Sequence, residues 1–460
     1  MEFASVLPAW HDPRRSLGAR RPGHGERVRD AGGELASGRA VADVGVLVAA
    51  GLLTMNAARA TWSTTRNVSA AGWEGQDSPT VAVDRQGRRL LVWAACNSAL
   101  PGCYHQVQAR FMPQGGAMGP ILTLSPLGTS SAWPEVDVDD DGDAAVVWQQ
   151  DSQVVARRVS RTGALGPLRK LSPEIGINPE VAVSPGGRAL VAWSDRRDGL
   201  WRTMAQFFYP DGSVGPLHNF GGGSAEKPAV GVDRNGVHVV AWAQGYDRVV
   251  ARRIKPGYVS PLKDLTSGTA AVGGPGFGML RVGVDRDGDT LVSFLAGGTN
   301  GPRVWVRRWS RSGALGSLLA VSSPTYAAGF HHTVATDLDG DSILVWTRHN
   351  ATAYQTELLG RRLSAAGTLG GPVRLGLGDR PEVALDDNGD GLVVWHAPGS
   401  PQDATQVKAR TISQTGVFGA ARTLSTDGRV TRTDTSPTGR FAVVWQRKSY
   451  PYTIKAAFGP

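Results

Sequence analysis

One spacing recurs eight times along this chain of 460 residues. In each copy an Asp or Ser precedes a Gly by three residues, and a Trp or Phe follows that Gly by six. The aromatic residues lie 45 to 55 residues apart, an interval typical of small antiparallel sheets arranged around an axis. The copies are Asp84, Gly87 and Trp93; Asp139, Gly142 and Trp148; Ser184, Gly187 and Trp193; Asp233, Gly236 and Trp242; Asp285, Gly288 and Phe294; Asp337, Gly340 and Trp346; Asp386, Gly389 and Trp395; and Ser436, Gly439 and Trp445.

The seventh copy shows how one such unit folds. Val383 and Leu385 alternate with Ala384, which is the period of a β-strand. In the turn that follows, the Asp side chain can accept hydrogen bonds from turn amides, and the Gly can take a left-handed conformation. We therefore predict four strands: one around 383–385, one at 392–395, one at 407–411 and one ending at 425.

The two ends of the chain complete each other. Seven copies are complete from residue 78 to about residue 428, whereas the eighth, 429–460, ends after its third strand. Residues 66–72 read like residues 422–428, the fourth strand of copy seven. The chain is therefore predicted to be all-β, with 61–460 forming a single β-propeller of eight four-stranded antiparallel blades whose last blade is closed by the N-terminal strand. Seven blades are the alternative, because copy five has Phe294 and irregular flanks.

Residues 1–60 are predicted to be a disordered leader. Within them, 39–60 contain an Arg, the apolar run Val44–Leu53 and the small-residue site Ala58–Ala60, the order found in a secretory signal. The apolar run is too short to span a bilayer, so we expect no membrane span in the mature protein. These features favour a secreted or cell-envelope location, and the alternative is a disordered cytoplasmic tail.

The two cysteines agree with export. Cys96 and Cys103 enclose a short loop, and a disulfide there would staple this connection in an oxidising compartment. A reduced, buried pair is the alternative. The formal charge of +9 is spread through the repeats without a nucleic-acid motif, so we expect no specific nucleic-acid partner and a monomer.

From residue 61 onward the chain resembles secreted bacterial β-propeller repeat proteins, in which Asp-x-x-Gly turns are common. The Trp-Asp ending of WD40 blades is missing, and the sialidase Asp-box is only loosely echoed, since Asp285, Gly288 and Phe294 have other spacings. The resemblance implies a fold that serves binding, scaffolding and several chemistries, so it does not select a function.

An Arg in the third strand accompanies the turn Asp in six copies. The two copies with Ser184 and Ser436 have Gln206 and Ala457 at the Arg position. We infer a structural ion pair in each of the six blades, and a functional Arg ring is the alternative. The predicted pairs are Asp84 with Arg110, Asp139 with Arg157, Asp233 with Arg252, Asp285 with Arg307, Asp337 with Arg361, and Asp386 with Arg410.

Candidate binding residues lie on the variable connections, which are expected to share one face. They are Arg196, Arg197, Trp201, Tyr246, Arg348, His349, His396, Arg447 and Tyr450. A second group, predicted to form a polar rim around the channel and not a catalytic carboxylate pair, comprises Glu135, Glu180, Glu382, Arg281 and Arg432. No catalytic or metal-ligating set is predicted. The acidic turn 137–142 leaves calcium as a possible ligand, although no Glu completes a calcium loop.

The expected function is that of an exported, non-enzymatic propeller that binds an envelope component, a glycan or a partner protein through its variable-loop face. One alternative is a carbohydrate-active enzyme of sialidase or lyase type, which requires an Arg cluster with a Tyr or carboxylate nucleophile over the axis. The other alternative is a purely structural propeller.

Overall fold

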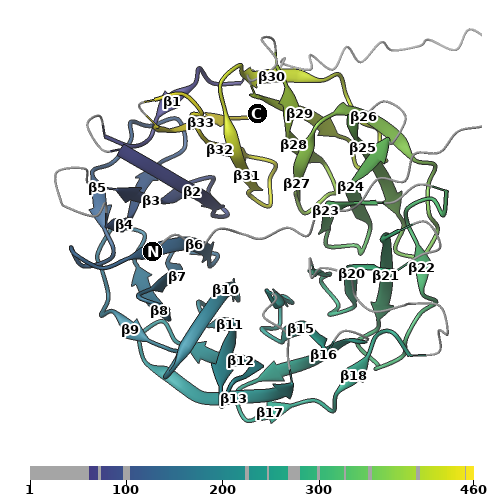
Figure 1. Cartoon of the computed structure of the whole chain (residues 1–460), viewed down its shortest axis with the longest axis horizontal. Coiled ribbons are helices and arrows are strands. Elements are labelled where there is room, and N and C mark those ends of the chain that lie inside the picture. Colours follow the sequence, from purple (N-terminus) through teal and green to yellow (C-terminus); the bar gives the residue numbers. More distant parts are fainter. Residues whose placement is uncertain are drawn as a thin grey trace, which may run out of the picture. The chain divides into compact units, whose positions relative to one another are not determined.

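The computed structural model describes residues 62–70, 74–96, 104–222, 227–245, 248–267, 280–297, 301–325, 328–350, 355–399, 405–450 and 452–459. In these residues the secondary structure is β-strand, and the strands form eight antiparallel sheets around an axis (Figure 1). The predicted all-β, eight-bladed propeller is confirmed, and the seven-bladed alternative is wrong. The predicted leader lies outside the described residues.

Each blade runs from its innermost to its outermost strand. Blades 1 to 4 are β2 (Glu74–Val83), β3 (Arg89–Cys96), β4 (His105–Met112) and β5 (Ile121–Thr123); β6 (Ser131–Val138), β7 (Ala144–Gln150), β8 (Gln153–Val159) and β9 (Arg169–Lys170); β10 (Ile175–Val183), β11 (Ala189–Arg197), β12 (Leu200–Phe208) and β13 (Val214–Gly222); and β14 (Ala229–Val232), β15 (His238–Gln244) and β16 (Arg248–Lys255), with an outer edge divided into β17 (Tyr258–Val259) and β18 (Lys263–Asp264).

Blades 5 to 8 follow the same order. They are β19 (Arg281–Val284), β20 (Thr290–Ala296), β21 (Arg303–Trp309) and β22 (Leu319–Ala320); β23 (Ala328–Thr336), β24 (Ser342–Asn350), β25 (Gln355–Leu363) and β26 (Val373–Leu377); β27 (Asp379–Leu385), β28 (Gly391–Pro398), β29 (Thr405–Ile412) and β30 (Arg422–Ser425); and β31 (Arg429–Thr435), β32 (Phe441–Gln446), β33 (Ile454–Phe458) and β1 (Arg66–Asn67).

The N-terminal strand closes the ring as predicted. β1 pairs antiparallel with β33, and Arg66 lies opposite Ala456. Beyond this pair, the Val68 amide donates to the Ile454 carbonyl at 2.8 Å, and the Val68 side chain is fully buried. Closure joins the two ends of the described chain and covers the outer edge of blade 8 (Figure 1).

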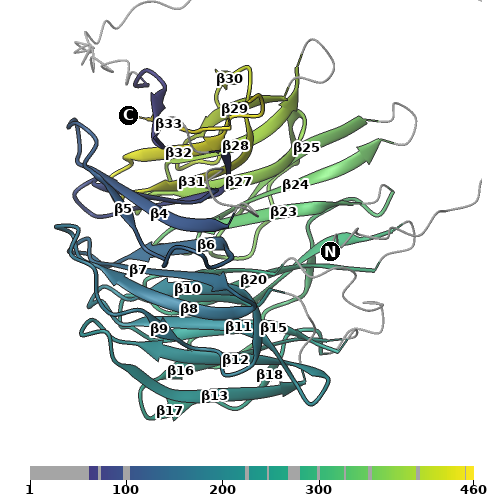
Figure 2. The ribbon, with the colours of Figure 1, turned by 60° about the vertical axis from the view of Figure 1, so that its left-hand side comes forward.

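The core lies between neighbouring blades. The aromatic residue of each second strand is buried and packs on the blade before it; Trp193, for example, belongs to one buried cluster with Val147 and Ala156 of blade 2, and Trp445 to one with Val394 of blade 7. The oblique view in Figure 2 shows the strands of successive blades running side by side. The repeated aromatic residue is therefore the main inter-blade contact.

Strand order assigns the connections to these two faces. Turns from first to second and from third to fourth strand lie on one face, which we call the Asp-turn face. Connections from second to third strand and between blades lie on the other, the variable-loop face.

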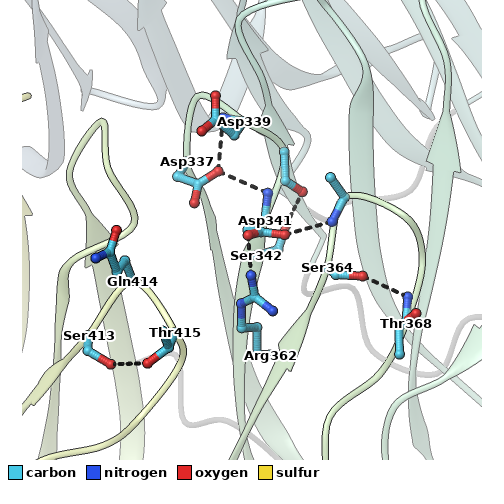
Figure 3. A network of polar contacts seen from close by, with 12 residues as sticks. Asp337, Asp339, Asp341, Ser342, Arg362, Ser364, Thr368, Ser413, Gln414 and Thr415 are labelled. Atoms are coloured by element: carbon cyan, nitrogen blue, oxygen red, sulfur yellow. Dashed lines mark hydrogen bonds and ion pairs between the residues drawn. The ribbon is translucent and has the colours of Figure 1, made fainter. Parts of the chain in front are cut away.

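In blade 6, Asp337 Oδ1 accepts the amides of Asp339 at 3.0 Å and Asp341 at 2.9 Å (Figure 3). Its Oδ2 faces the next blade, where a Cβ at Gly389 would lie 2.6 Å away.

The predicted Asp–Arg ion pairs are wrong. Among the described residues, no ion pair joins Asp84 to Arg110, Asp139 to Arg157, Asp233 to Arg252, Asp285 to Arg307, Asp337 to Arg361, or Asp386 to Arg410. The turn carboxylate is instead occupied by amides of its own turn. Charge partners at this face come from other positions: Arg88 Nε lies 2.5 Å from Asp84 Oδ2, and Arg362 pairs with Asp341 (Figure 3).

The third-strand Arg binds backbone carbonyls. Arg157 donates from Nε to the Gly166 carbonyl at 2.8 Å and from Nη1 to the Leu124 carbonyl of the preceding blade, also at 2.8 Å. Arg110, Arg307 and Arg361 repeat this pattern. Gln206 donates to the equivalent Gly215 carbonyl at 2.7 Å. In blade 3 the Gln206 side-chain amide therefore takes the place of the guanidinium group at this carbonyl. The absence of both the Arg and the turn Asp from this blade does not reflect an ion pair between them.

Candidate functional site

A ring of side chains lines the axis. Each first strand starts near the variable-loop face, and the residue thirteen positions before the repeated aromatic stands at the same level in every blade. These channel-ring positions are Thr80, Glu135, Glu180, Ala229, Arg281, Thr333, Glu382 and Arg432. Six of them, all except Ala229 and Thr333, line one cavity of about 240 Å³, which we call the axial cavity. The predicted polar channel rim is confirmed for all five of its residues.

The register of the first strand shifts before the ring in six blades, and in five of these the shift contains a left-handed residue. These five residues stand two positions before the ring and have φ between 50° and 55°, a left-handed conformation that is uncommon outside glycine. They are Ser78, Trp133, Asn178, Arg380 and Val430, and the strand register shifts at each of them. The bulge adds a residue to the strand and redirects the side chains after it, a device common beside functional sites.

All three glutamates of the ring have a cationic partner. Lys227 lies between Glu135 and Glu180: its Nζ contacts Glu135 Oε1 and lies 2.9 Å from Glu180 Oε1. On the other side, Arg432 Nη1 lies 3.2 Å from Glu382 Oε1. The side chains of Lys227 and its two partners keep 20 to 30% of their surface exposed, so solvent reaches charges that are surrounded by protein.

The two glutamates on Lys227 have opposite pKa shifts. Burial opposes the ionisation of Glu135, but the positive charges of Lys227 and Arg432 outweigh burial and lower its pKa. Burial raises the pKa of Glu180, because Lys227 offsets it only in part and the charge of Glu135 adds to it. Burial also opposes the charged form of Lys227, yet its two carboxylate partners raise its pKa. The environments of two adjacent carboxyl groups are thus unequal.

Two aspartates lie deeper along the first strands. Asp137 Oδ2 accepts the Val183 amide of blade 3 at 2.7 Å, and Asp434 Oδ2 accepts the Val83 amide of blade 1 at 2.7 Å. Each bond satisfies an amide on an innermost strand, which has a sheet neighbour on one side only. Burial raises the pKa of Asp137 to about 7 and that of Asp434 to about 6. Both carboxyl groups line the axial cavity.

Arg281 is the cation of the axial cavity that is not held by a carboxylate. Its Nη1 donates to the Leu280 carbonyl at 3.1 Å, and it forms no ion pair within the part of the chain that the structure describes. Arg281 lines the cavity, and a guanidinium group suits an acidic or hydroxyl group of a ligand.

An ion-pair network crosses the axis at the Asp-turn face. Asp387 of blade 7 lies 2.6 Å from Arg234 of blade 4 and 3.9 Å from Arg85 of blade 1, and Arg85 lies 3.7 Å from Asp140 of blade 2. Each of these residues directly follows the first residue of an Asp-x-x-Gly turn. The network ties four blades together at the end of the channel away from the variable loops.

Three arginines predicted as binding residues are held by nearby carboxylates. Arg197 Nε lies 2.9 Å from Asp195 Oδ1, and Arg447 Nε lies 3.0 Å from Asp427 Oδ2. Arg348 pairs with Glu357, which also pairs with Arg374 at 2.9 Å. These guanidinium groups stabilise their own connections.

The other predicted residues are dispersed. Arg196 lies opposite Trp201 across the hairpin of β11 and β12, exposed His349 lies 3.5 Å from the Thr356 hydroxyl, and Tyr450 is 63% exposed. His396 is not a surface loop residue: burial lowers its pKa to about 4, and its Nε2 accepts the Thr431 amide at 3.0 Å. Tyr246 and Cys103 lie outside the described residues, so the disulfide to buried Cys96 stays a prediction. None of the described members of this set lines the axial cavity.

Adjacent His331 and His332 point to opposite sides of β23, as successive residues of a strand do. His331 Nδ1 lies 2.7 Å from Asp379 Oδ1 at the start of β27, whereas His332 Nε2 lies 3.1 Å from the Ser293 hydroxyl of blade 5. The described residues contain no group of three or more His, Cys, Asp or Glu arranged to hold a metal ion. They also contain no helix of the length and apolarity needed to cross a membrane.

Neither Lys227 of the axial cavity nor Trp133, which is close in sequence to Glu135 of that cavity, was predicted from the sequence. Lys227 is separated from its partner Glu135 by 92 residues, and nothing local indicates the contact. Trp133 stands in the bulge two residues before Glu135 and is 55% exposed. A signal was present, because a Pro precedes Glu135, Glu180 and Glu382, and a Pro inside a strand marks an edge or a bulge.

The chain has structural neighbours but no match by sequence. No protein-family model and no curated protein matches the chain. The chain is similar in structure to a prolyl endopeptidase (TM-score 0.49, 15% identity, 82% of this chain and 55% of the other), so it spans about half the length of that protein. It is also similar to the Dos1 propeller (TM-score 0.49, 7% identity, 86% and 94%) and to an ulvan lyase (TM-score 0.48, 9% identity, 85% and 95%).

Proposed function

We propose that this protein is an exported, non-enzymatic binding protein that takes the end of a glycan chain into the axial cavity from the variable-loop face. The observation that carries the proposal is the convergence of charged side chains from six blades on one cavity. The bulges support it, because left-handed Trp133 and Val430 are retained beside this cavity at a conformational cost.

The chemistry of the cavity suits a hydroxyl-rich ligand. Carboxylates and cations that already neutralise each other can still donate to and accept from hydroxyl groups, and Arg281 adds donors for an acidic substituent. Exposed Trp133 offers an aromatic face for the apolar side of a sugar ring. A cavity of about 240 Å³ is smaller than the ~300–1,000 Å³ of most ligand pockets, so we expect it to hold one terminal sugar residue.

The ligand is expected to enter from the variable-loop face. At the opposite end of the channel, the network of Arg234, Asp387, Arg85 and Asp140 crosses the axis. The leader 39–60 supports export. Mass spectrometry of the exported protein tests this part, with cleavage near residue 61 and a Cys96–Cys103 disulfide as the expected result, and two free thiols as the contrary one.

Binding is tested on a glycan array and then by calorimetry with the glycan selected. Arg281→Gln should weaken binding about tenfold, because it removes a direct contact in the cavity, and Trp133→Ala should weaken it because it removes the exposed aromatic ring two residues before Glu135. The matched control for Trp133→Ala is Tyr450→Ala, which removes an exposed aromatic ring on the connection between β32 and β33 and not on a first strand. Loss of binding in Tyr450→Ala with full binding in Trp133→Ala would move the site to the loops.

One observation favours a second candidate, a carbohydrate-active enzyme. Around Lys227, the pKa of Glu135 is lowered and that of Glu180 is raised, which is the division expected of a base and an acid. Turnover of chromogenic glycosides or polysaccharides by the purified protein, lost in Glu180→Gln, would establish the enzyme. Saturable binding without turnover supports the binding protein, and absence of both supports a purely structural propeller.

A further inference from the structure

We propose a second binding site, for an acidic saccharide, in a cavity between blades 4 and 5. This cavity has a volume of about 570 Å³, within the ~300–1,000 Å³ range of ligand pockets. It opens at the Asp-turn face, since its lining includes turn residues Gly288 and Gly313. The proposal does not rest on the function proposed for the axial cavity, which lies at other residues.

The cavity arises where blade 4 departs from the repeat. In five other blades the last residue of the third strand pairs with an apolar residue six positions later, as Val159 does with Leu165 and Trp309 does with Leu315. In blade 4, Ile254 pairs instead with Val259, five positions later, and the outer edge is divided into β17 and β18. The shortened turn leaves a hollow beside blade 5 and leaves Tyr258 48% exposed.

Cations surround this hollow. Arg253 forms part of its wall: the guanidinium lies 4.1 Å from the centre of the Trp309 ring and donates to the Trp309, Ser310 and Gly288 carbonyls at 2.9 to 3.0 Å. Lys255 lies 5.8 Å from the centre of the Tyr258 ring. Lys255, Lys263 and Arg311 line the cavity, and none of them forms an ion pair with a described carboxylate.

One acidic side chain, Asp233, also lines the cavity, and its Oδ1 accepts the Val237 amide at 2.8 Å. Four cations therefore face one carboxylate, which leaves the hollow positively charged. Such a site attracts a carboxylate or sulfate group.

The exposed Tyr258 ring and Leu262 add apolar surface on which a sugar ring can pack. Because the cations are gathered in one hollow and not along a track, a single acidic sugar residue fits better than the repeated phosphates of a nucleic acid.

The test is calorimetric titration of the full chain with two acidic probes, a sulfated heparin disaccharide and a galacturonic acid dimer, and with the neutral disaccharide cellobiose. We expect the chain to bind one or both acidic probes and not cellobiose. Lys255→Ala combined with Lys263→Ala should weaken this binding about tenfold or more, because two charged contacts are lost. The probe that binds more tightly identifies sulfate or carboxylate as the preferred group.

The matched control is Arg161→Ala combined with Lys170→Ala, which removes two exposed cations from blade 2. This control should bind the acidic probes like the unchanged protein. Failure of the chain to bind either acidic probe, or equal weakening in the blade 2 control, would overturn the proposal. Tighter binding of a DNA oligonucleotide, weakened by the same two lysine substitutions, would also overturn it in favour of a nucleic-acid surface.

Discussion

The carboxyl group of Asp137 should make the protein less stable as the pH rises. Its pKa in the folded protein is about 7, against an ordinary value of 3.8, because it is buried beside the axial cavity. Between these two pH values the folded state holds a proton that the unfolded state has lost. The stability from this proton is fully present below the unfolded pKa and disappears as the pH rises through about 7.

The size of the effect follows from this pKa difference. Since one pKa unit corresponds to about 1.4 kcal/mol, Asp137 should remove roughly 2 to 3 kcal/mol from the free energy of unfolding between about pH 5 and about pH 8. Asp434, whose pKa is about 6, acts in the same direction. Buried His238, His332 and His396 act in the opposite direction because their pKa values are lowered to about 4, 3 and 4.

The assay compares Asp137→Asn with the unchanged protein by urea unfolding across this pH range. The histidines and Asp434 are present in both proteins, so the difference between the two pH profiles isolates Asp137. An Asn can still accept the Val183 amide, although it loses the second acceptor that Asp137 offers to the Val138 amide. We expect the unchanged protein to lose roughly 2 to 3 kcal/mol more than the variant from about pH 5 to about pH 8. Parallel profiles would refute the reasoning.

Three further predictions concern the fold. Gly142→Ala should lower the free energy of unfolding by about 1–3 kcal/mol more than Gly128→Ala does. Both glycines have φ above +80°, but only a Cβ at Gly142 would meet the carboxylate of the preceding blade, 2.4 Å away. Equal losses of stability in urea unfolding would disprove the close approach. Deleting residues 62–70 should lower the melting temperature and promote dimers through the uncovered edge, and unchanged melting of a monomer would contradict closure. Arg157→Gln should reduce stability less than Arg157→Ala does, because an amide can still donate to a carbonyl. The stability losses of Arg157→Ala and Asp139→Ala should add, and a coupling energy above about 1 kcal/mol in the double variant would instead support an ion pair between the two residues.

The architecture could be predicted because its signals are local and repeated. The alternation around Ala384, the turn chemistry of Asp386 and Gly389, and the recurring aromatic residue each depend on neighbours in sequence, and eight copies add the same weak signal. Closure was also predictable, since residues 66–72 resemble a fourth strand that the C-terminal copy lacks. The polar channel ring followed from applying one repeat position to every blade.

The partners of individual side chains were decided by the tertiary structure alone. A covarying Asp and Arg suggested an ion pair, yet Arg157 binds carbonyls that only the packed blades bring within reach. Lys227 pairs with Glu135 over 92 residues, and Trp133 takes a left-handed conformation that its residue type does not favour. A repeat specifies which positions face the axis, but contacts across the axis and between blades depend on the distances that ring closure sets.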